Sequence, residues 1–356
     1  MENAYASDPG LWRKNFTDCY EQKHTRVITL NDITEQTFPA YCRLLEENGF
    51  VVQEARGRYA AYQKEGMGVF LNDWGSSLRI VLEENCNYFS FQSPAARADL
   101  SPQITQIHLE DFGMSYAIRL SDGRFILIDG GRDFPPDADE LFRCLKEGSL
   151  HSVPIIAAWI MSHPHSDHVP CFGTFMERYG AQVIIEKILY NFPQAAKFVP
   201  PDKPKEEKTL SENVDKDTVE PFEALVKELG IPVYTPHTGQ IYLIGDALCE
   251  ILSSLDDTIH CATNINATSL VIRMELGGQV ILWATDASFS HAHPAERYGT
   301  YLKPIFCKCR ITALARVPMR RRSNALISSV PPPVCCPYPS TTPTTFSAPI
   351  VRVQTT

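Results

Sequence analysis

Short apolar runs separated by polar turns fill the first hundred residues, a pattern typical of a small mixed α and β unit. Residues 27–30 predict a strand. Apolar residues between 38 and 45 recur at the spacing of one helical face, and Gly49 follows them as a helix-ending glycine. Four more strands are predicted between glycine-containing turns, at 50–54, 59–63, 68–71 and 78–82. We expect a separate α+β domain over residues 1–95, with a packing or substrate-positioning role.

Longer elements follow in residues 96–303, after a linker rich in Ala, Ser and Pro at 93–102. The run 153–161 is continuously apolar, as a strand buried on both faces is. A charged stretch at 200–217 is interpreted as a solvated loop. Helices are predicted at 137–147, 170–179 and 217–229, the last with a capping-box-like start at Asp217 and Glu220 and with Gly230 after it. Strands are predicted at 115–120, 125–128, 183–190, 240–243, 247–253, 269–276 and 279–284.

Three histidines and one aspartate stand directly after the apolar run 153–161. Neutral imidazoles and carboxylates are the ligands that zinc and similar cations prefer. Alternate residues of an extended segment point the same way, so His163 and His165 can converge on one ion. Asp167 and His168 enter the next turn and can address a second ion about 3.5–4 Å away, the separation of two-metal hydrolases. We therefore expect a metal site on this strand-to-helix loop rather than a ligand-free surface loop.

The loop at 163–168 resembles the HxHxDH signature of the metallo-β-lactamase superfamily, and two other stretches agree with it in the family's order. Upstream, a predicted hairpin ends in Asp129-Gly130-Gly131, which is similar to the family's Asp-Gly-Gly. Downstream, the strand at 279–284 leads to Asp286, which matches the family's metal-bridging aspartate. Together these stretches cover roughly residues 103–303.

This resemblance implies the fold and the assignment of ligands. The fold would be α+β, a metallo-β-lactamase αββα sandwich with metals at one edge, preceded by the small N-terminal domain. His163 and His165 would hold one ion, Asp167 and His168 the other, and Asp286 would bridge them. Asp129 would support the metal loop from behind. The cofactor would be two Zn²⁺ ions, with Mn²⁺ or Fe²⁺ as alternatives, and metal-bound hydroxide would attack the substrate.

The third ligand of the first ion is not a histidine in the expected place. Asn266 opens Asn-x-x-Ser-Leu, which resembles a branch of the superfamily that includes the hydrolase domain of bacterial DNA-uptake channel proteins. An amide oxygen there would be a weaker ligand than imidazole. His237 precedes two strands that should come before the ligand position, so we interpret it as a loop histidine. His293 is kept as a remote alternative.

Composition indicates which partners and which cellular compartment to expect. The 356 residues carry a formal net charge of −9, which argues against a broad nucleic-acid footprint. No stretch approaches the roughly 20 apolar residues of a membrane span, and the chain shows no signal region. The 11 cysteines lack regular spacing before the tail and are interpreted as reduced thiols. We expect a cytoplasmic protein without a membrane partner; the sequence leaves the oligomeric state open.

From Pro304 the composition changes abruptly. Residues 304–356 contain no Asp, Glu, Gly or His, but hold nine of the 26 prolines and four of the 11 cysteines. Either this is a natural disordered tail, or it is translated in the wrong reading frame. One back-translation of residues 304–315, read from its third nucleotide, gives Asp-Ile-Leu-Gln-Val-Pro-His-His-Gly-Phe-Gly. That is a strand followed by the family's last metal motif, so we hypothesise a frameshift near residue 303.

The leading hypothesis is a metal-dependent hydrolase whose activity is impaired in this chain, because the frameshift would remove the closing histidine, the last strand and the last helix. Phosphodiesters or other esters are the expected substrates, through analogy with the Asn-x-x-Ser branch. The alternative is a pseudoenzyme, a non-catalytic binding protein of the same fold. Lactam hydrolysis is a third alternative.

Overall fold

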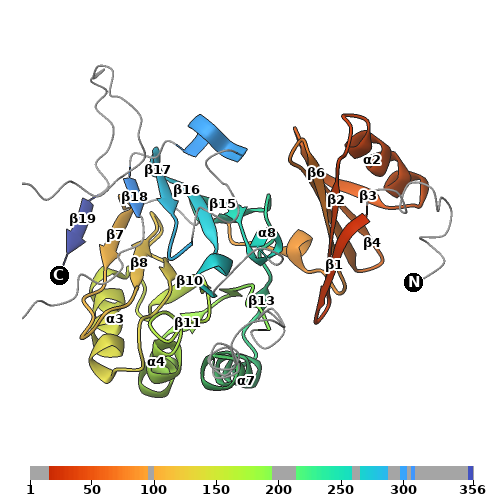
Figure 1. Ribbon diagram of the computed structural model, residues 1–356. Helices are drawn as coiled ribbons and strands as arrows, with labels where there is room; N and C mark the ends of the chain where they lie inside the picture. Colours follow the sequence, from red (N-terminus) through yellow and green to blue (C-terminus); the bar gives the residue numbers. More distant parts are fainter. Residues whose placement is uncertain are drawn as a thin grey trace, which may run out of the picture.

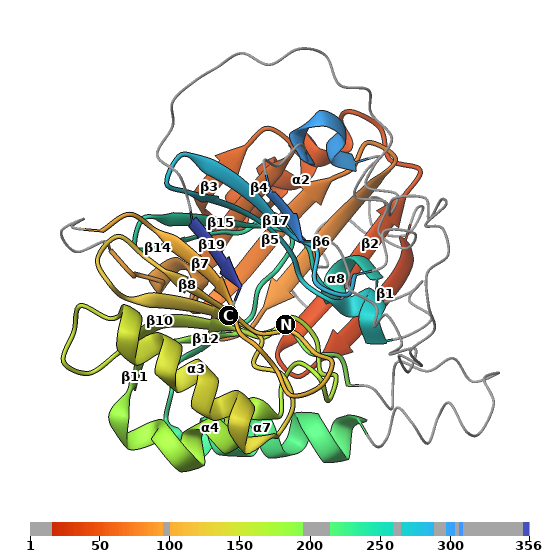
Figure 2. The ribbon, with the colours of Figure 1, turned by 90° about the vertical axis from the view of Figure 1, so that its left-hand side faces the viewer.

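The computed structural model describes residues 16–94, 100–194, 214–258, 265–287, 297–302, 306–308 and 352–355. It contains three β-sheets, of six, eight and five strands. We call them the N-terminal sheet, the large sheet and the small sheet. Figure 1 shows the N-terminal sheet on one side and the other two sheets together on the other, and Figure 2 gives the perpendicular view.

The N-terminal sheet is antiparallel, with the order β1-β2-β6-β5-β4-β3. Successive side chains of a strand point to opposite faces, so each strand supplies both faces of the sheet. Helix α2 (Thr37–Glu47) covers one face, where Tyr41 packs on Leu71 and Ile80. The opposite face carries Tyr59 and Phe70. The strands are β1 (Phe16–Gln22), β2 (Thr25–Asn31), β3 (Val51–Arg56), β4 (Tyr59–Lys64), β5 (Met67–Asp73) and β6 (Ser77–Glu83).

The large sheet has the order β13-β12-β10-β9-β8-β7-β19, with β11 also paired to β10. Strands β9, β10, β12 and β13 are parallel, so their carboxyl ends lie at the same edge. This edge receives the predicted metal loop. The strands are β7 (Gln103–Gln106), β8 (Tyr116–Arg119), β9 (Phe125–Ile128), β10 (Ile155–Ile160), β11 (Ile184–Ile185), β12 (Ile188–Leu189), β13 (Val233–Tyr234) and β19 (Arg352–Thr355).

The small sheet faces the large sheet, and the main core lies between them. Its strands are β14 (Ile241–Ile244), β15 (Ala247–Ser253), β16 (Val271–Leu276), β17 (Gln279–Trp283) and β18 (Phe306–Lys308), in that order. The fully buried residues between the two sheets include Ile118, Ile126, Tyr242, Ile272 and Trp283.

Helices cover the outer faces of both sheets. On the large sheet these are α3 (Pro135–Gly148), α4 (Cys171–Tyr179) and α7 (Glu220–Leu229). On the small sheet Tyr298 and Leu302, in or beside the short helix η5 (Gly299–Leu302), pack over Leu252 and Leu282. The predicted α+β class and αββα sandwich are therefore confirmed. Among the helices that the structure describes, none is long and apolar enough to cross a membrane.

Two sequence predictions of elements were wrong. The single strand expected at 183–190 is two short strands, β11 and β12, because Glu186 and Lys187 interrupt it. The helix expected from Asp217 begins at Glu220, follows the π-helix η3 (Asp215–Val219), and has no side-chain cap. Gly230 does end it, in the left-handed conformation. The sequence reasoning also missed β1, β7, β13 and the short helices η1 (Tyr88–Ser90), η2 (Gly180–Gln182), α8 (Leu255–Thr258) and η4 (Ile265–Thr268).

The tail contributes two short strands. β18 lies parallel to β17 at the edge of the small sheet, and β19 lies parallel to β7 at the edge of the large sheet. These two strands account for seven residues of the tail. The rest of the tail lies outside the described residues, as do 95–99 of the expected linker and 200–213 of the expected charged loop.

Candidate metal centre

The metal loop, residues 162–168, leaves the carboxyl end of β10 between two parallel neighbours. On one side Asp129 follows β9 and donates its backbone N–H to the carbonyl of Ile160. From the facing small sheet, the N–H of Leu270 donates to the carbonyl of Ser162 at 3.1 Å. The loop is therefore held from both sheets at the edge of the sandwich.

The five predicted ligands lie together. The ligand atoms of His163, His168 and Asp286 are all within 4.8 Å of one another. His165 Nδ1 lies 3.1 Å from His163 Nε2. On the other side Asp167 Oδ2 lies 3.6 Å from His168 Nε2, and Asp286 Oδ2 lies 3.8 Å from the same nitrogen. Three imidazoles and two carboxylates that converge in this way form a donor set suited to divalent cations.

Asp129 lies behind the ligands, as expected for a supporting residue. Its carboxylate accepts hydrogen bonds from the N–H of Ser162 at 2.7 Å and from the hydroxyl of Ser162 at 2.7 Å. Its Oδ2 also lies 2.8 Å from His168 Nδ1. A proton on that nitrogen leaves Nε2 of His168 as the atom that faces the other ligands. The fully buried Asp129 therefore fixes the orientation of His168.

Two residues of the site have a left-handed backbone conformation that side chains rarely adopt. Asp129 has φ 55° and Thr285, which precedes Asp286, has φ 48°. The hydroxyl of Thr285 donates to the carbonyl of Leu270 at 3.1 Å. Such conformations cost on the order of 1–3 kcal/mol and cluster at functional sites. Here they aim the carboxylates of Asp129 and Asp286 at the metal loop from opposite sheets.

The electrostatics of the site favour a bound cation. Burial lowers the pKa of His168, but the carboxylates of Asp129, Asp167 and Asp286 outweigh this effect and raise it. The buried imidazole is thus surrounded by more negative charge than one proton compensates. A metal ion bound at Nε2 would supply positive charge in place of the proton, because a histidine must lose the proton on its ligating nitrogen before it binds a metal.

Asn266, predicted to be a weak ligand, has an unsatisfied acceptor atom among the described residues. It lies on η4, four residues before Leu270, whose N–H bonds the metal loop. Its side-chain oxygen is buried and makes no hydrogen bond within the described residues. A buried acceptor without a donor is uncommon and calls for a further partner. A cation bound by Asn266 would be such a partner.

A second loop, residues 109–113, lies against the metal loop. The N–H of Met114 donates to the carbonyl of Asp167 at 3.1 Å. A Cβ at Gly113 would stand 2.7 Å from that same carbonyl oxygen, so the close approach requires glycine. Phe112 is 51% exposed there, and the guanidinium of Arg132 lies 5.0 Å from its ring centroid. Sequence reasoning missed this loop, and it also missed Ser162 and Thr285.

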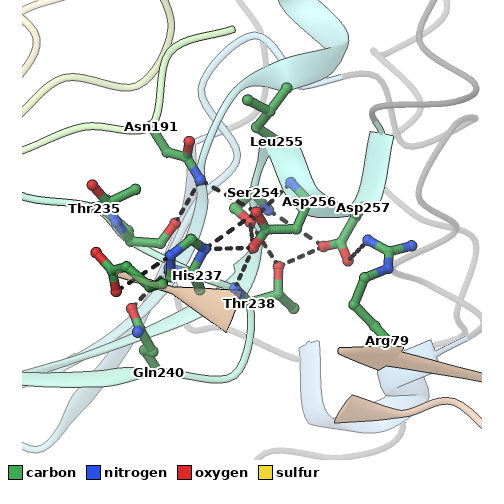
Figure 3. A network of polar contacts seen from close by, with 12 residues as sticks. Arg79, Asn191, Thr235, His237, Thr238, Gln240, Ser254, Leu255, Asp256 and Asp257 are labelled. Atoms are coloured by element: carbon green, nitrogen blue, oxygen red, sulfur yellow. Dashed lines mark hydrogen bonds and ion pairs between the residues drawn. The ribbon is translucent and has the colours of Figure 1, made fainter. Parts of the chain in front are cut away.

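His237 lies apart from this donor set. Its Nδ1 is 3.0 Å from Asp256 Oδ2 (Figure 3). Its Nε2 is 3.6 Å from Glu83 Oε2 in the N-terminal sheet. The interpretation of His237 as a loop histidine agrees with its position between β13 and β14. It is nevertheless fully buried, where two sheets meet. His293 lies outside the described residues.

Comparison with known proteins gives a family match for part of the chain. Residues 109–248 match the model of the metallo-β-lactamase superfamily, so the predicted resemblance is confirmed. A search of the curated proteins gave no match. The metallo-β-lactamase fold protein YhfI from Bacillus subtilis is 16% identical, with a TM-score of 0.33, over 52% of this chain and 62% of that protein.

Two other solved structures show comparable overlap. A metallo-β-lactamase from Cronobacter sakazakii with substitutions in a HARLDQ motif is 14% identical, with a TM-score of 0.31, over 56% of this chain and 68% of that one. CmlA, a diiron β-hydroxylase from Streptomyces venezuelae, is 13% identical, with a TM-score of 0.30, over 52% of this chain and 30% of that one. At such identities and TM-scores the matches bear on no individual residue of the site.

Proposed function

We propose that this chain, metallo-β-lactamase-like over residues 109–248, is a metal-dependent hydrolase. The observation that carries the proposal is the convergence of His163, His168 and Asp286 within 4.8 Å, with Asp129 behind them. His163 and His165, with Asn266, would hold one ion. Asp167 and His168 would hold the other, with Asp286 between the two. Zn²⁺ suits these ligands best, with Mn²⁺ and Fe²⁺ as alternatives.

Bound divalent ions would lower the pKa of a coordinated water to about 7 and stabilise the oxygen that gains charge on the substrate. The residues of the chain provide the geometry for this chemistry. Asp129 and Ser162 fix the ring of His168, and the strained backbone at Thr285 directs Asp286 into the site. The reaction class we propose is hydrolysis of a phosphodiester or another ester.

A cavity of about 300 Å³ lies between the sandwich and the N-terminal sheet. Tyr190 and Asn191 line it and directly follow β12, the parallel neighbour of β10. None of the described residues that line the cavity is a predicted metal ligand. The N-terminal sheet supplies the opposite wall through residues such as Glu83.

We propose a small ester as substrate rather than a nucleic-acid strand, because the net charge of −9 argues against a broad nucleic-acid surface. The five cysteines whose side chains are described are free thiols, which supports a cytoplasmic setting.

Metal analysis joined to a hydrolysis assay tests the proposal. The purified chain is dialysed against Zn²⁺, its metal content is measured, and turnover of bis(p-nitrophenyl) phosphate is compared with that of p-nitrophenyl acetate. Asp167→Ala removes a ligand without opening a core cavity, so it should abolish hydrolysis and keep the circular dichroism spectrum. Wild-type turnover by Asp167→Ala, or a chain that binds no metal, would contradict the hydrolase.

The tail favours a second candidate. A frameshift near residue 303 would remove the histidine that closes the second site, leaving a pseudoenzyme that binds one metal or none. Two equivalents of metal with turnover support the enzyme. One equivalent or none, without turnover of either ester, supports a binding protein.

A further inference from the structure

Six charged side chains from two sheets form a buried ionic cluster away from the metal ligands. The cations are Arg79, His237 and Arg297, and the carboxylates are Glu83, Asp256 and Asp257. Each of these side chains is at most 11% exposed. With His237 protonated the cluster is neutral, as burial of so many charges requires. Arg79 and Glu83 come from β6 of the N-terminal sheet, and the other four come from the sandwich.

Asp257 lies at the centre of the cluster. Its Oδ1 is 3.2 Å from Arg79 Nη1, and its Oδ2 is 3.4 Å from Arg297 Nη1. The hydroxyl of Thr238 donates to the same Oδ2 at 2.6 Å (Figure 3). Both guanidinium groups also lie over the ring of Trp74, Arg79 at 4.4 Å and Arg297 at 4.1 Å from its centroid. Arg79 is thus fixed by a carboxylate at its tip and an aromatic ring along its plane.

Asp256, the neighbour of Asp257, also accepts several hydrogen bonds. It receives hydrogen bonds from the Ser254 hydroxyl at 2.8 Å and from His237 Nδ1 at 3.0 Å. The amide of Asn191 donates to its other oxygen at 3.4 Å. Helix α8, which carries both aspartates, therefore has its position set by the cluster rather than by apolar packing alone.

One further short helix connects helix α8 with the metal loop. Helix α8 contacts η4, the short helix that carries Asn266. From the other side, Leu270 after η4 donates its N–H to Ser162 at the start of the metal loop. Arg297 in turn comes from the segment that follows Asp286 and donates to the carbonyl of Leu252 at 2.7 Å. The cluster therefore includes the helix that contacts η4 and a residue that follows Asp286 in the sequence.

We propose that the N-terminal sheet is part of the metal centre's support, and that Arg79 is a positioning residue that acts through Asp257 and α8 on Asn266. This inference rests on the proposed metal site. The N-terminal sheet would then set metal affinity without contributing a ligand.

The test measures Zn²⁺ affinity of the full chain by competition with a chromophoric chelator. Arg79→Met keeps the length and apolar stem of the side chain but removes its charge. We expect a roughly tenfold loss of affinity at the weaker site, because the freed α8 no longer fixes Asn266. Arg79→Lys keeps the charge and should recover most of the loss. The absorption spectrum of the Co²⁺-loaded chain should change in Arg79→Met, which reports ligand geometry independently of activity.

Tyr88→Phe is the matched control. Tyr88 joins the same two sheets through its hydroxyl, which donates to the carbonyl of Ile241 at 3.2 Å, but it is outside the cluster. The Zn²⁺ affinity of the Tyr88→Phe chain should stay within twofold of that of the parent chain, even if its melting temperature falls. Equal Zn²⁺ affinity and an unchanged Co²⁺ spectrum in Arg79→Met would overturn the proposal.

A double-mutant cycle tests whether Arg79 affects metal binding through Asn266 or independently of it. If Arg79 acts through Asn266, Arg79→Met should add little to the loss caused by Asn266→Ala. Additive losses would refute that route. A parent chain that binds no Zn²⁺ would contradict the proposed function, whereas metal binding that ignores Arg79 contradicts only this inference.

Discussion

Nδ1 of His168 lies 2.8 Å from Oδ2 of Asp129, and this pair joins the ends of two neighbouring parallel strands. The same carboxylate holds Ser162 by two further hydrogen bonds. Asp129 thus organises the metal loop from a fully buried position without being placed to bind the ion itself.

Asp129→Asn should therefore weaken metal binding. The amide keeps the shape of the carboxylate but loses its charge and one acceptor, so His168 is less well oriented. Loss of such a supporting residue costs roughly 10- to 100-fold in metal affinity. Chelator competition with Zn²⁺ measures the change. Asp139→Asn is the control, because Asp139 forms an exposed pair with Arg178 on the outer helices. Equal affinities in the two variants would refute the supporting role of Asp129.

Gly239→Ala should loosen the contact between the N-terminal sheet and the sandwich. Gly239 has φ +94°, and an added Cβ would stand 2.5 Å from the ring of the buried Tyr59. Overpacking of this kind costs about 1–3 kcal/mol of unfolding free energy. Gly173→Ala in α4 is the control, since nothing lies within 4 Å of its added Cβ. That variant should gain about 0.5–1 kcal/mol from helix propensity. Urea denaturation compares them, and equal midpoints would contradict the tight contact.

The residues of this site that could be predicted are those with a short-range signal in the sequence. The metal loop was recognisable because its ligands fall within six residues, and Asp129 and Asp286 because each directly follows an apolar strand in the family's order. Ser162 carries no such signal, since a serine at a strand end is common. The conformation of Thr285 depends on the facing strand, through its bond to Leu270. Local sequence does not record such a contact.

The ionic cluster was even harder to predict from the local sequence than Ser162 and Thr285. Arg79 and Asp257 are 178 residues apart, and Arg79 stands in a strand of ordinary pattern. Because the N-terminal residues contain no ligand cluster, the sequence predicted only a packing or substrate-positioning role for them. Only the arrangement of sheets in space reveals that their charges reach the segment before Asn266. The fold class was predictable from periodicity and motifs, whereas long-range ion pairs were not.

The cluster should make stability depend on pH. Burial lowers the pKa of His237, but the carboxylates of Asp256 and Glu83 outweigh this effect and raise the pKa to about 10. Because the folded chain binds this proton more tightly than the unfolded chain, the stabilisation is complete below about 6.5 and is lost as the pH rises towards 10.

Over that range the unfolding free energy should fall by about 1.4 kcal/mol per pH unit from this group. Urea denaturation at pH 6.5, 7.5 and 8.5 measures the slope. His237→Gln cannot take up the proton, so its profile should be flatter than that of the parent. Parallel profiles for the two chains would show that His237 does not titrate in this way.

Restoring the reading frame after Lys303 should repair the metal centre and the sandwich edge together. The frame-corrected chain would gain the closing histidine and a full last strand in place of the three-residue β18. Because metal binds only the folded state, Zn²⁺ should stabilise by mass action, by about 2.7 kcal/mol at a hundredfold excess over Kd. The chain as given should bind less zinc, show a smaller rise in melting temperature, and be cut more readily beyond residue 303. A chain ending at residue 303 is the control that separates loss of the native segment from any effect of the tail. Equal zinc content and equal melting temperatures in the given and the corrected chains would show that the tail is no defect, as would sequencing of the locus that supports the frame as written.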